Sequence, residues 1–135
     1  MSSLFTKIIK GEIPCYKIAE DDSFLAFLDI NPLVRGHALV IPKVEIDYLF
    51  DIDDDLLQNM IIFAKNVASK IKNAIPCDRV GVSVIGLEVP HAHIHLIPIS
   101  NIGDMNFNNS KLALSSKEMF NIQKDIIGRN TKLDL

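Results

Sequence analysis

The stretch His91–Ile97 alternates histidine with apolar residues, and this alternation constrains the fold more than any other part of the chain. In a β-strand, successive side chains point to opposite faces of the sheet. His91, His93 and His95 would therefore share one face, while the residues between them fill the other. A buried sheet face explains the apolar residues, but folding gives no reason for three imidazoles opposite them. Since the chain has only four histidines, we interpret this strand as a functional site.

Apolar spacing elsewhere predicts helices and further strands. From Asp54 to Ala74, apolar residues recur every three or four positions, which is typical of an amphipathic helix. Asp53 can cap its start, and Pro76 prevents its continuation. We expect shorter helices at residues 3–10 and from Ser115 onward, and strands near residues 16–19, 23–28, 36–41, 79–85 and 91–97. Strands that pair locally beside a long helix favour an α+β layer with an antiparallel sheet.

Composition narrows the functional classes. A length of 135 residues suits one domain, and a net charge of −3 argues against general nucleic-acid binding. No apolar run reaches the roughly 20 residues of a membrane span, and the start of the chain shows no secretory signal. Cys15 and Cys77 are isolated, which indicates reduced thiols. We therefore expect a cytoplasmic protein without nucleic-acid or membrane partners.

Three imidazoles on one strand face allow several kinds of chemistry. Positions i and i+4 of a strand lie roughly 13 Å apart, whereas zinc lies about 2.1 Å from its histidine ligand. His91 and His95 therefore could not share one ion, although an adjacent pair could chelate with a carboxylate such as Glu88. A polar face of hydrogen-bonded histidines is the second alternative. The favoured interpretation is nucleophilic and acid–base catalysis at a phosphate, in which the flanked His93 attacks.

The residues resemble those of the histidine triad (HIT) superfamily of nucleotide hydrolases and transferases. His91–Ile97 matches its His-φ-His-φ-His-φ-φ signature, and the segments Leu4–Pro14, Phe27–Pro32 and Gly36–Lys43 match in order and approximate spacing. The resemblance implies an antiparallel five-stranded sheet packed against the long helix, in a single HIT-like domain over residues 1–135. The core would span about residues 3–99, with a C-terminal extension at residues 100–135.

The resemblance also implies a homodimer, in which the two five-stranded sheets join into one. An unpaired sheet edge gives a physical reason for such pairing. We expect its interface at the end of the long helix near Ile71 and at the strand that begins at Arg79. Arg79 itself is interpreted as a solvated charge rather than a phosphate ligand.

The resemblance assigns roles to the histidines. The family nucleophile falls on His93, and His95 would stabilise charge near the leaving group. His91 would orient the other members of the triad. The fourth histidine, His37, would lie behind His91 and orient it, although a buried, hydrogen-bonded histidine explains the same residue.

Other positions match the nucleotide-binding residues of the family. Asp29 matches the acid that accepts hydrogen bonds from the ribose hydroxyls, and it could also stabilise its own turn. Ser83 loosely occupies the place of an asparagine that contacts phosphate. Five apolar positions match the slot for the base, although each could equally be core: Phe5, Ile8, Phe27, Ile30 and Leu39.

The chain departs from the family at three places. Ser3 and Thr6 occupy the positions of a cysteine pair that binds structural zinc in part of the family, so we expect no zinc and no cofactor. Leu87 stands where the family commonly has a glutamine that reaches a phosphate, and leucine cannot donate a hydrogen bond. His95 stands where the sugar-1-phosphate nucleotidylyltransferases carry glutamine, which favours the hydrolases.

The resulting prediction is a metal-independent hydrolase that acts at the α-phosphate of a purine nucleotide through a nucleotidyl-His93 intermediate. Cleavage of a nucleoside phosphoramidate to the monophosphate is favoured, with hydrolysis of dinucleoside polyphosphates as the alternative. A nucleotide-binding interaction protein with incidental catalysis is an alternative of another class. The segment from Ser100 to the last helix is interpreted as a connector rather than a lid, with Met105 and Phe107 as anchors.

Overall fold

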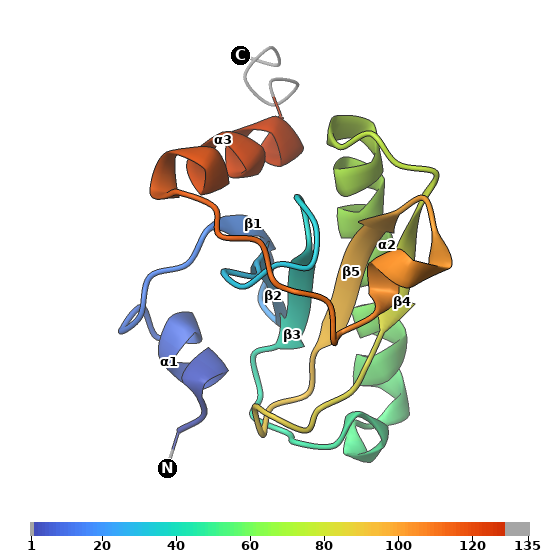
Figure 1. Ribbon diagram of the computed structural model, residues 1–135. Helices are drawn as coiled ribbons and strands as arrows, with labels where there is room; N and C mark the ends of the chain where they lie inside the picture. The colour runs from blue at the N-terminus through green and yellow to red at the C-terminus, as the bar shows by residue number, and fades with distance from the viewer. Residues whose placement is uncertain (1, 129–135) are drawn as a thin grey trace.

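A computed structural model describes residues 2–128 as an α+β fold with an antiparallel sheet, as the sequence predicts (Figure 1). The strands have the order β1-β2-β3-β5-β4, and all neighbouring pairs are antiparallel. The elements in chain order are α1 (Leu4–Ile9), β1 (Lys17–Glu20), β2 (Phe24–Leu28), β3 (Ala38–Pro42), the 3-10 turn η1 (Leu49–Asp51), α2 (Asp54–Ala74), β4 (Arg79–Ser83), β5 (Ile94–Ile99), the 3-10 turn η2 (Ile102–Met105) and α3 (Ser116–Ile127).

The two longer helices begin at side-chain caps, and the one at Asp53 is the cap predicted above. The Asp53 carboxylate accepts a hydrogen bond of 2.9 Å from the backbone N–H of Leu56, which satisfies one of the free donors at the start of α2. Ser115 and Glu118 form a reciprocal capping box at the start of α3. No helix within residues 2–128 combines the length and apolar character needed to cross a bilayer.

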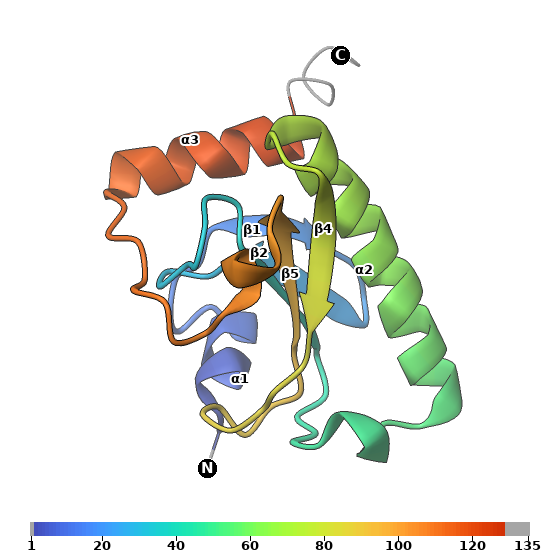
Figure 2. The same ribbon diagram turned by 45° about the vertical axis from the view of Figure 1, so that its right-hand side comes forward.

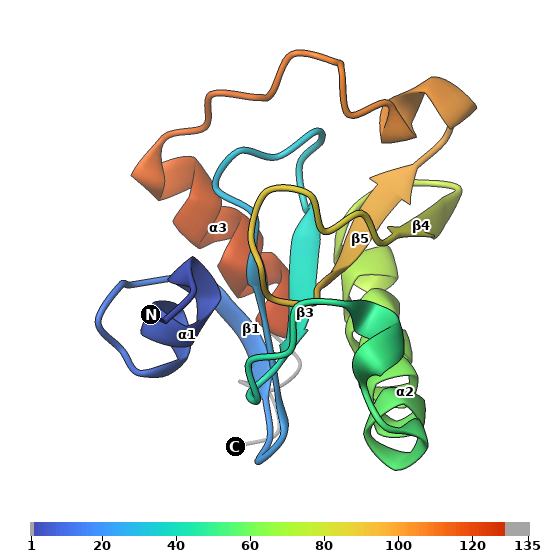
Figure 3. The ribbon, with the colours of Figure 1, turned by 90° about the horizontal axis from the view of Figure 1, so that it is seen from below.

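Each face of the sheet packs against different helices. Apolar side chains of α2 and α3 pack on one face, where they meet Ala92, Ile94 and Leu96 of the alternating stretch. On the opposite face, Phe5 of α1 packs with apolar residues of β2 and β3. Figure 3 shows α1 and α2 on these opposite sides of the sheet. The two-faced alternation predicted for residues 91–97 therefore holds.

The strand predicted at residues 91–97 begins later than the alternation suggests. Pairing between β3 and β5 starts at Val40 and Ile94, so the first two histidines precede the strand. The reason is that the N–H of Ala92 donates to the carbonyl of Ile46 at 2.7 Å, outside the ladder. The histidines nevertheless remain on one side, because Ala92 and Ile94, which alternate with them, lie in the core on the opposite face.

Strand register places one histidine in a row with residues of three other strands. Phe27 pairs with Leu39, Leu39 pairs with His95, and His95 pairs with Ser83. Directly paired residues of neighbouring strands share a face. His95 therefore lies on the α1 side of the sheet, beside the apolar residues predicted to hold a base.

Candidate active site

A cavity of about 580 Å³ opens on the α1 side of the sheet, within the range of volumes that small-molecule sites occupy. His37, His93, His95 and Asp29 line it. All five apolar residues predicted for the base slot also line it: Phe5, Ile8, Phe27, Ile30 and Leu39. The cavity thus combines an apolar wall with a few convergent polar groups.

The protonation of His93 follows from its backbone contact. Its Nδ1 lies 2.7 Å from the carbonyl oxygen of His91, which can only accept a hydrogen bond. Nδ1 therefore carries the proton, and in the neutral ring the lone pair is on Nε2. The ring of Phe5 packs edge-on against His93, with centroids 5.0 Å apart, and fixes the orientation of the imidazole. A neutral imidazole that lines the cavity and has a free lone pair on Nε2 is a competent nucleophile.

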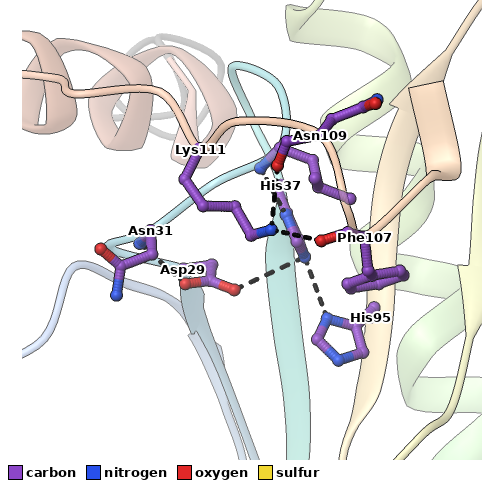
Figure 4. Close-up of polar contacts among 8 residues, drawn as sticks. Asp29, Asn31, His37, His95, Phe107, Asn109 and Lys111 are labelled. Carbon is purple, nitrogen blue, oxygen red and sulfur yellow. Dashed lines mark hydrogen bonds and ion pairs between the residues drawn. The ribbon is translucent and has the colours of Figure 1, made fainter.

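A chain of hydrogen bonds fixes the protons of His37 and His95. The backbone N–H of Leu33 donates to Nδ1 of His37 at 3.0 Å, so the proton of that neutral ring is on Nε2. Nε2 of His37 then donates to Nδ1 of His95 at 3.0 Å (Figure 4). As a result, the proton of His95 lies on Nε2, where it can donate a hydrogen bond to a ligand.

Burial keeps both rings of this pair neutral. Desolvation and the neighbouring His95 lower the pKa of His37 to about 3. Desolvation, with a smaller contribution from His93, lowers the pKa of His95 to about 4. At neutral pH His95 is therefore a neutral hydrogen-bond donor, and a positive charge at the site must come from elsewhere.

The prediction that His37 orients His91 is wrong. His37 is the residue immediately before β3, whose Ala38 pairs with Leu96, so the register brings its ring next to His95. His91 instead lies behind the cavity, fully buried, and does not line it. Its Nε2 donates to the carbonyl of Pro42 at 2.8 Å, and its Nδ1 accepts from the hydroxyl of Ser3 at 2.8 Å.

Ser3 and Thr6, at the positions of the zinc-binding cysteines in part of the family, belong to a hydrogen-bond network in this chain. The carboxylate of Glu45 accepts from the backbone N–H of Ser3 at 2.7 Å and from the hydroxyl of Thr6. These two bonds lower the pKa of Glu45 to about 2. Since neutral hydroxyls replace the thiolates that zinc prefers, Ser3 and Thr6 do not fit a structural zinc site. The network instead ties α1 to His91.

Asp29 stabilises its own turn and also lines the cavity. Its Oδ1 accepts a hydrogen bond of 2.8 Å from the N–H of Asn31, which stabilises the turn after β2. Its Oδ2 lies 3.6 Å from Nε2 of His37, too far for a hydrogen bond, and remains available on the cavity side. Burial raises the pKa of this carboxyl, with the N–H of Asn31 acting in the opposite direction.

Asp29, His37 and His95 place three potential ligand atoms within 4.8 Å of one another. A metal ion on Nε2 of His37 would require Nδ1 to carry the proton. The N–H of Leu33 already points at Nδ1, so that tautomer would bring two donors together. This hydrogen bond makes the cluster unsuited to a metal ion.

The residues that line the cavity differ in part from the site residues predicted from the sequence. Ser83 pairs with His95 but does not line the cavity. Phe107, Asn108 and Lys111 do line it, although the sequence indicates only that Phe107 is an anchor. They come from the segment between β5 and α3, which we predicted to be a connector. That prediction is incomplete because the segment also covers the site, and no periodicity in it could have indicated this.

Comparison with known proteins agrees with this geometry. A family model described as the HIT domain matches residues 10–102. This chain belongs to the HIT family. The adenosine 5'-monophosphoramidase of Schizosaccharomyces pombe is 40% identical over 103 residues, which cover 75% of this HIT protein and 77% of the relative.

Two solved structures share the HIT fold. A HIT-like protein from Bartonella henselae, described as involved in cell-cycle regulation, has a TM-score of 0.80 and 30% identity, and the match covers 93% of this chain and 95% of that one. A zinc-bound histidine triad family protein from Mycobacterium smegmatis has a TM-score of 0.80 and 27% identity, with 99% and 96% covered. The five-stranded sheet packed against a long helix is therefore the HIT fold.

Proposed function

We propose that this HIT protein is a nucleotide hydrolase that cleaves a purine nucleoside phosphoramidate at its α-phosphorus. The observation that carries the proposal is the contact of His93 Nδ1 with the His91 carbonyl, which leaves the lone pair on Nε2 of a ring that lines the cavity. Asp29 and the apolar slot flank this nitrogen and are suited to a ribose and a base. The S. pombe relative, named an adenosine 5'-monophosphoramidase, supports the same reaction class.

The reaction would proceed in two displacements at phosphorus. Nε2 of His93 forms a bond to the α-phosphorus while the P–N bond breaks and the amine departs with a proton taken from the solvent. Water then attacks the nucleotidyl-His93, releases the monophosphate and restores both His93 and the proton taken by the amine. Nε2–H of His95 would donate to a phosphoryl oxygen as negative charge develops.

Variants of His93 and His95 test this assignment. His93→Ala should abolish turnover of adenosine 5'-phosphoramidate but still bind AMP, because Asp29 and the slot are unchanged. His95→Ala should lose on the order of 10²–10³ in rate. If His95 also serves the second step, mass spectrometry should find AMP covalently attached to His93 in this variant. Full activity of His93→Ala, or a nucleotide attached to His91, would refute the assignment.

A substrate panel separates the remaining alternatives. Faster turnover of dinucleoside polyphosphates than of phosphoramidates would favour the polyphosphate hydrolase. Saturable AMP binding without turnover of either substrate would favour a nucleotide-binding interaction protein. The cytoplasmic location expected from the unpaired cysteines stays a prediction, as does the division into a core and a C-terminal extension.

We also propose a two-fold homodimer that pairs the β4 edges. β4 lies at the end of the sheet, next to α2 (Figure 2). Val82 of β4 is 55% exposed on the α2 face, and Ile61 of α2 is 52% exposed. Phe63 contacts Phe24 of β2, so the flank of α2 that carries Ile61 faces the β4 side. Ile71 is fully buried within its own chain, so any contact near this end of α2 has to come from its exposed neighbours.

Light scattering tests the dimer. The wild-type protein should have a dimeric mass at micromolar concentration, and Ile61→Glu should reduce it to a monomer. Phe120→Glu is the control because Phe120 is also 52% exposed on a helix but lies on α3. A monomeric wild-type protein, or equal effects of the two variants, would contradict this interface.

A further inference from the structure

The cavity has an unbalanced charge for a nucleotide site. Among the described residues that line it, Asp29 and Glu88 are acidic, while Lys111 is the only lysine or arginine. His37 and His95 are neutral because burial lowers the pKa of each ring. A nucleotide monophosphate carries up to two negative charges near neutral pH. Among the described lining residues, one lysine is therefore the only fixed positive charge offered to a phosphate.

The segment that carries Lys111 is anchored on both sides of it. On the N-terminal side, the ring of Phe107 packs edge-on against His95, with centroids 4.9 Å apart, and against His37 at 6.2 Å. On the C-terminal side, the N–H of Leu112 donates to the carbonyl of Pro32 at 2.8 Å. In Figure 1 the segment runs from β5 back across the sheet to α3. These contacts place Lys111 over the cavity.

The Lys111 side chain is also oriented by its own backbone. Its Nζ donates to the carbonyls of Phe107 at 2.6 Å and Asn109 at 3.2 Å. An ammonium group has three donors, so one N–H remains for a ligand. Figure 4 shows the ammonium group near His37, between Asp29 and Phe107. Its charge also lowers the pKa of both Asp29 and His37, which is consistent with this proximity.

We propose that Lys111 binds the phosphate of a nucleotide held at His93 and His95. This inference rests on the proposed function, because it takes the phosphorus to lie at those two histidines. Nε2–H of His95 would contact one phosphoryl oxygen, and the ammonium group would neutralise the charge on another. Lys111 lies beyond residues 10–102, which match the family domain. The C-terminal segment thus completes a phosphate site that the shared domain leaves without a cation.

Calorimetric titration with AMP and with adenosine tests the proposal. Lys111→Met keeps an unbranched side chain of nearly the same length but removes its charge, so the Kd for AMP should rise about ten- to a hundredfold. The Kd for adenosine, which has no phosphate, should stay within about twofold. Lys111→Arg should retain most of the affinity for AMP. Lys117→Met is the matched control because Lys117 lies on α3 and does not line the cavity.

The outcomes separate this inference from the proposed function. If the wild-type protein neither binds AMP nor hydrolyses the phosphoramidate, both proposals fail. If the wild-type protein binds AMP and Lys111→Met binds it equally well, the Lys111 inference alone is refuted. An equal loss for AMP and adenosine would also refute it, because Lys111 would then support the shape of the segment rather than bind phosphate.

Discussion

His37 offers a direct test of whether tautomer control matters for catalysis, because its two ring nitrogens have separate tasks. Nδ1 accepts from the N–H of Leu33, and Nε2 donates to His95. In asparagine, the amide oxygen is separated from Cα by the same number of bonds as Nδ1 is in histidine. Glutamine has an amide nitrogen that corresponds in the same way to Nε2. The two variants therefore remove one task each.

His37→Gln should mainly lose stability. It can still donate to His95 but leaves the buried N–H of Leu33 without an acceptor, which costs about 1–3 kcal/mol. For a domain of this size, that loss lowers the melting temperature by roughly 5–10 °C. The value of kcat/KM for the phosphoramidate should remain within a few-fold of wild type, because the proton of His95 is still held on Nε2.

His37→Asn should mainly lose activity. It retains an acceptor for Leu33, but Nδ1 of His95 loses its donor, so the proton can move to Nδ1 and leave Nε2 without a hydrogen to donate. One neutral hydrogen bond contributes about 1 kcal/mol, so kcat/KM should fall at least several-fold. The fall cannot exceed the 10²–10³ expected for His95→Ala, since His37 acts only through His95.

A double-mutant cycle tests whether His37 acts only through His95. If His37 acts through His95, the variant that combines His37→Asn with His95→Ala should be no slower than His95→Ala alone. Multiplied losses in the double variant would show that His37 has an independent role. Wild-type activity of His37→Asn would refute tautomer control altogether. Thermal melts of all variants separate loss of fold from loss of function.

Two further predictions concern protons and metal. The pKa values of His37 and His95 are lowered to about 3 and about 4, so the unfolded chain binds more protons below pH 6.5. Stability should therefore be full above pH 6.5 and fall by up to about 1.4 kcal/mol per pH unit for each ring toward pH 4; equal urea midpoints at pH 7 and pH 5 would contradict this. The purified protein should contain no stoichiometric zinc, whereas the double variant Ser3→Cys, Thr6→Cys should bind one zinc with Nδ1 of His91 and the Glu45 carboxylate. Elemental analysis that finds one zinc per wild-type chain would refute this reasoning.

Local patterns predicted much of the fold because they depend on neighbouring residues. The bounds of α2 agree with the sequence because helical periodicity, the Asp53 cap and Pro76 all act within a few residues. The start of β5 does not agree, because the contact that ends its pairing, from Ala92 to Ile46, joins residues far apart in the chain. Alternation identifies a face, but it cannot say where a ladder stops.

The site, too, was predictable only where it depends on a local pattern. Alternation alone identified the triad, but it could not show that His37 contacts His95, because strand register decides that contact. Lys111 was missed because its position depends on the packing of Phe107 and on a hydrogen bond to Pro32. A lysine in a polar, turn-rich segment carries no local signal of such a location.

The proton positions of the triad and the positive charge of the site have different structural origins. Each triad tautomer depends on a main-chain group: the Leu33 N–H for His95 through His37, the His91 carbonyl for His93, and the Pro42 carbonyl for His91. Main-chain groups persist whatever side chains surround them, so the fold itself fixes the tautomers of the proposed nucleophile and the proposed donor. The positive charge that we propose for phosphate binding, in contrast, belongs to one side chain in a segment outside the matched domain. Changes in that segment should therefore alter which phosphate group is bound while leaving attack by His93 intact.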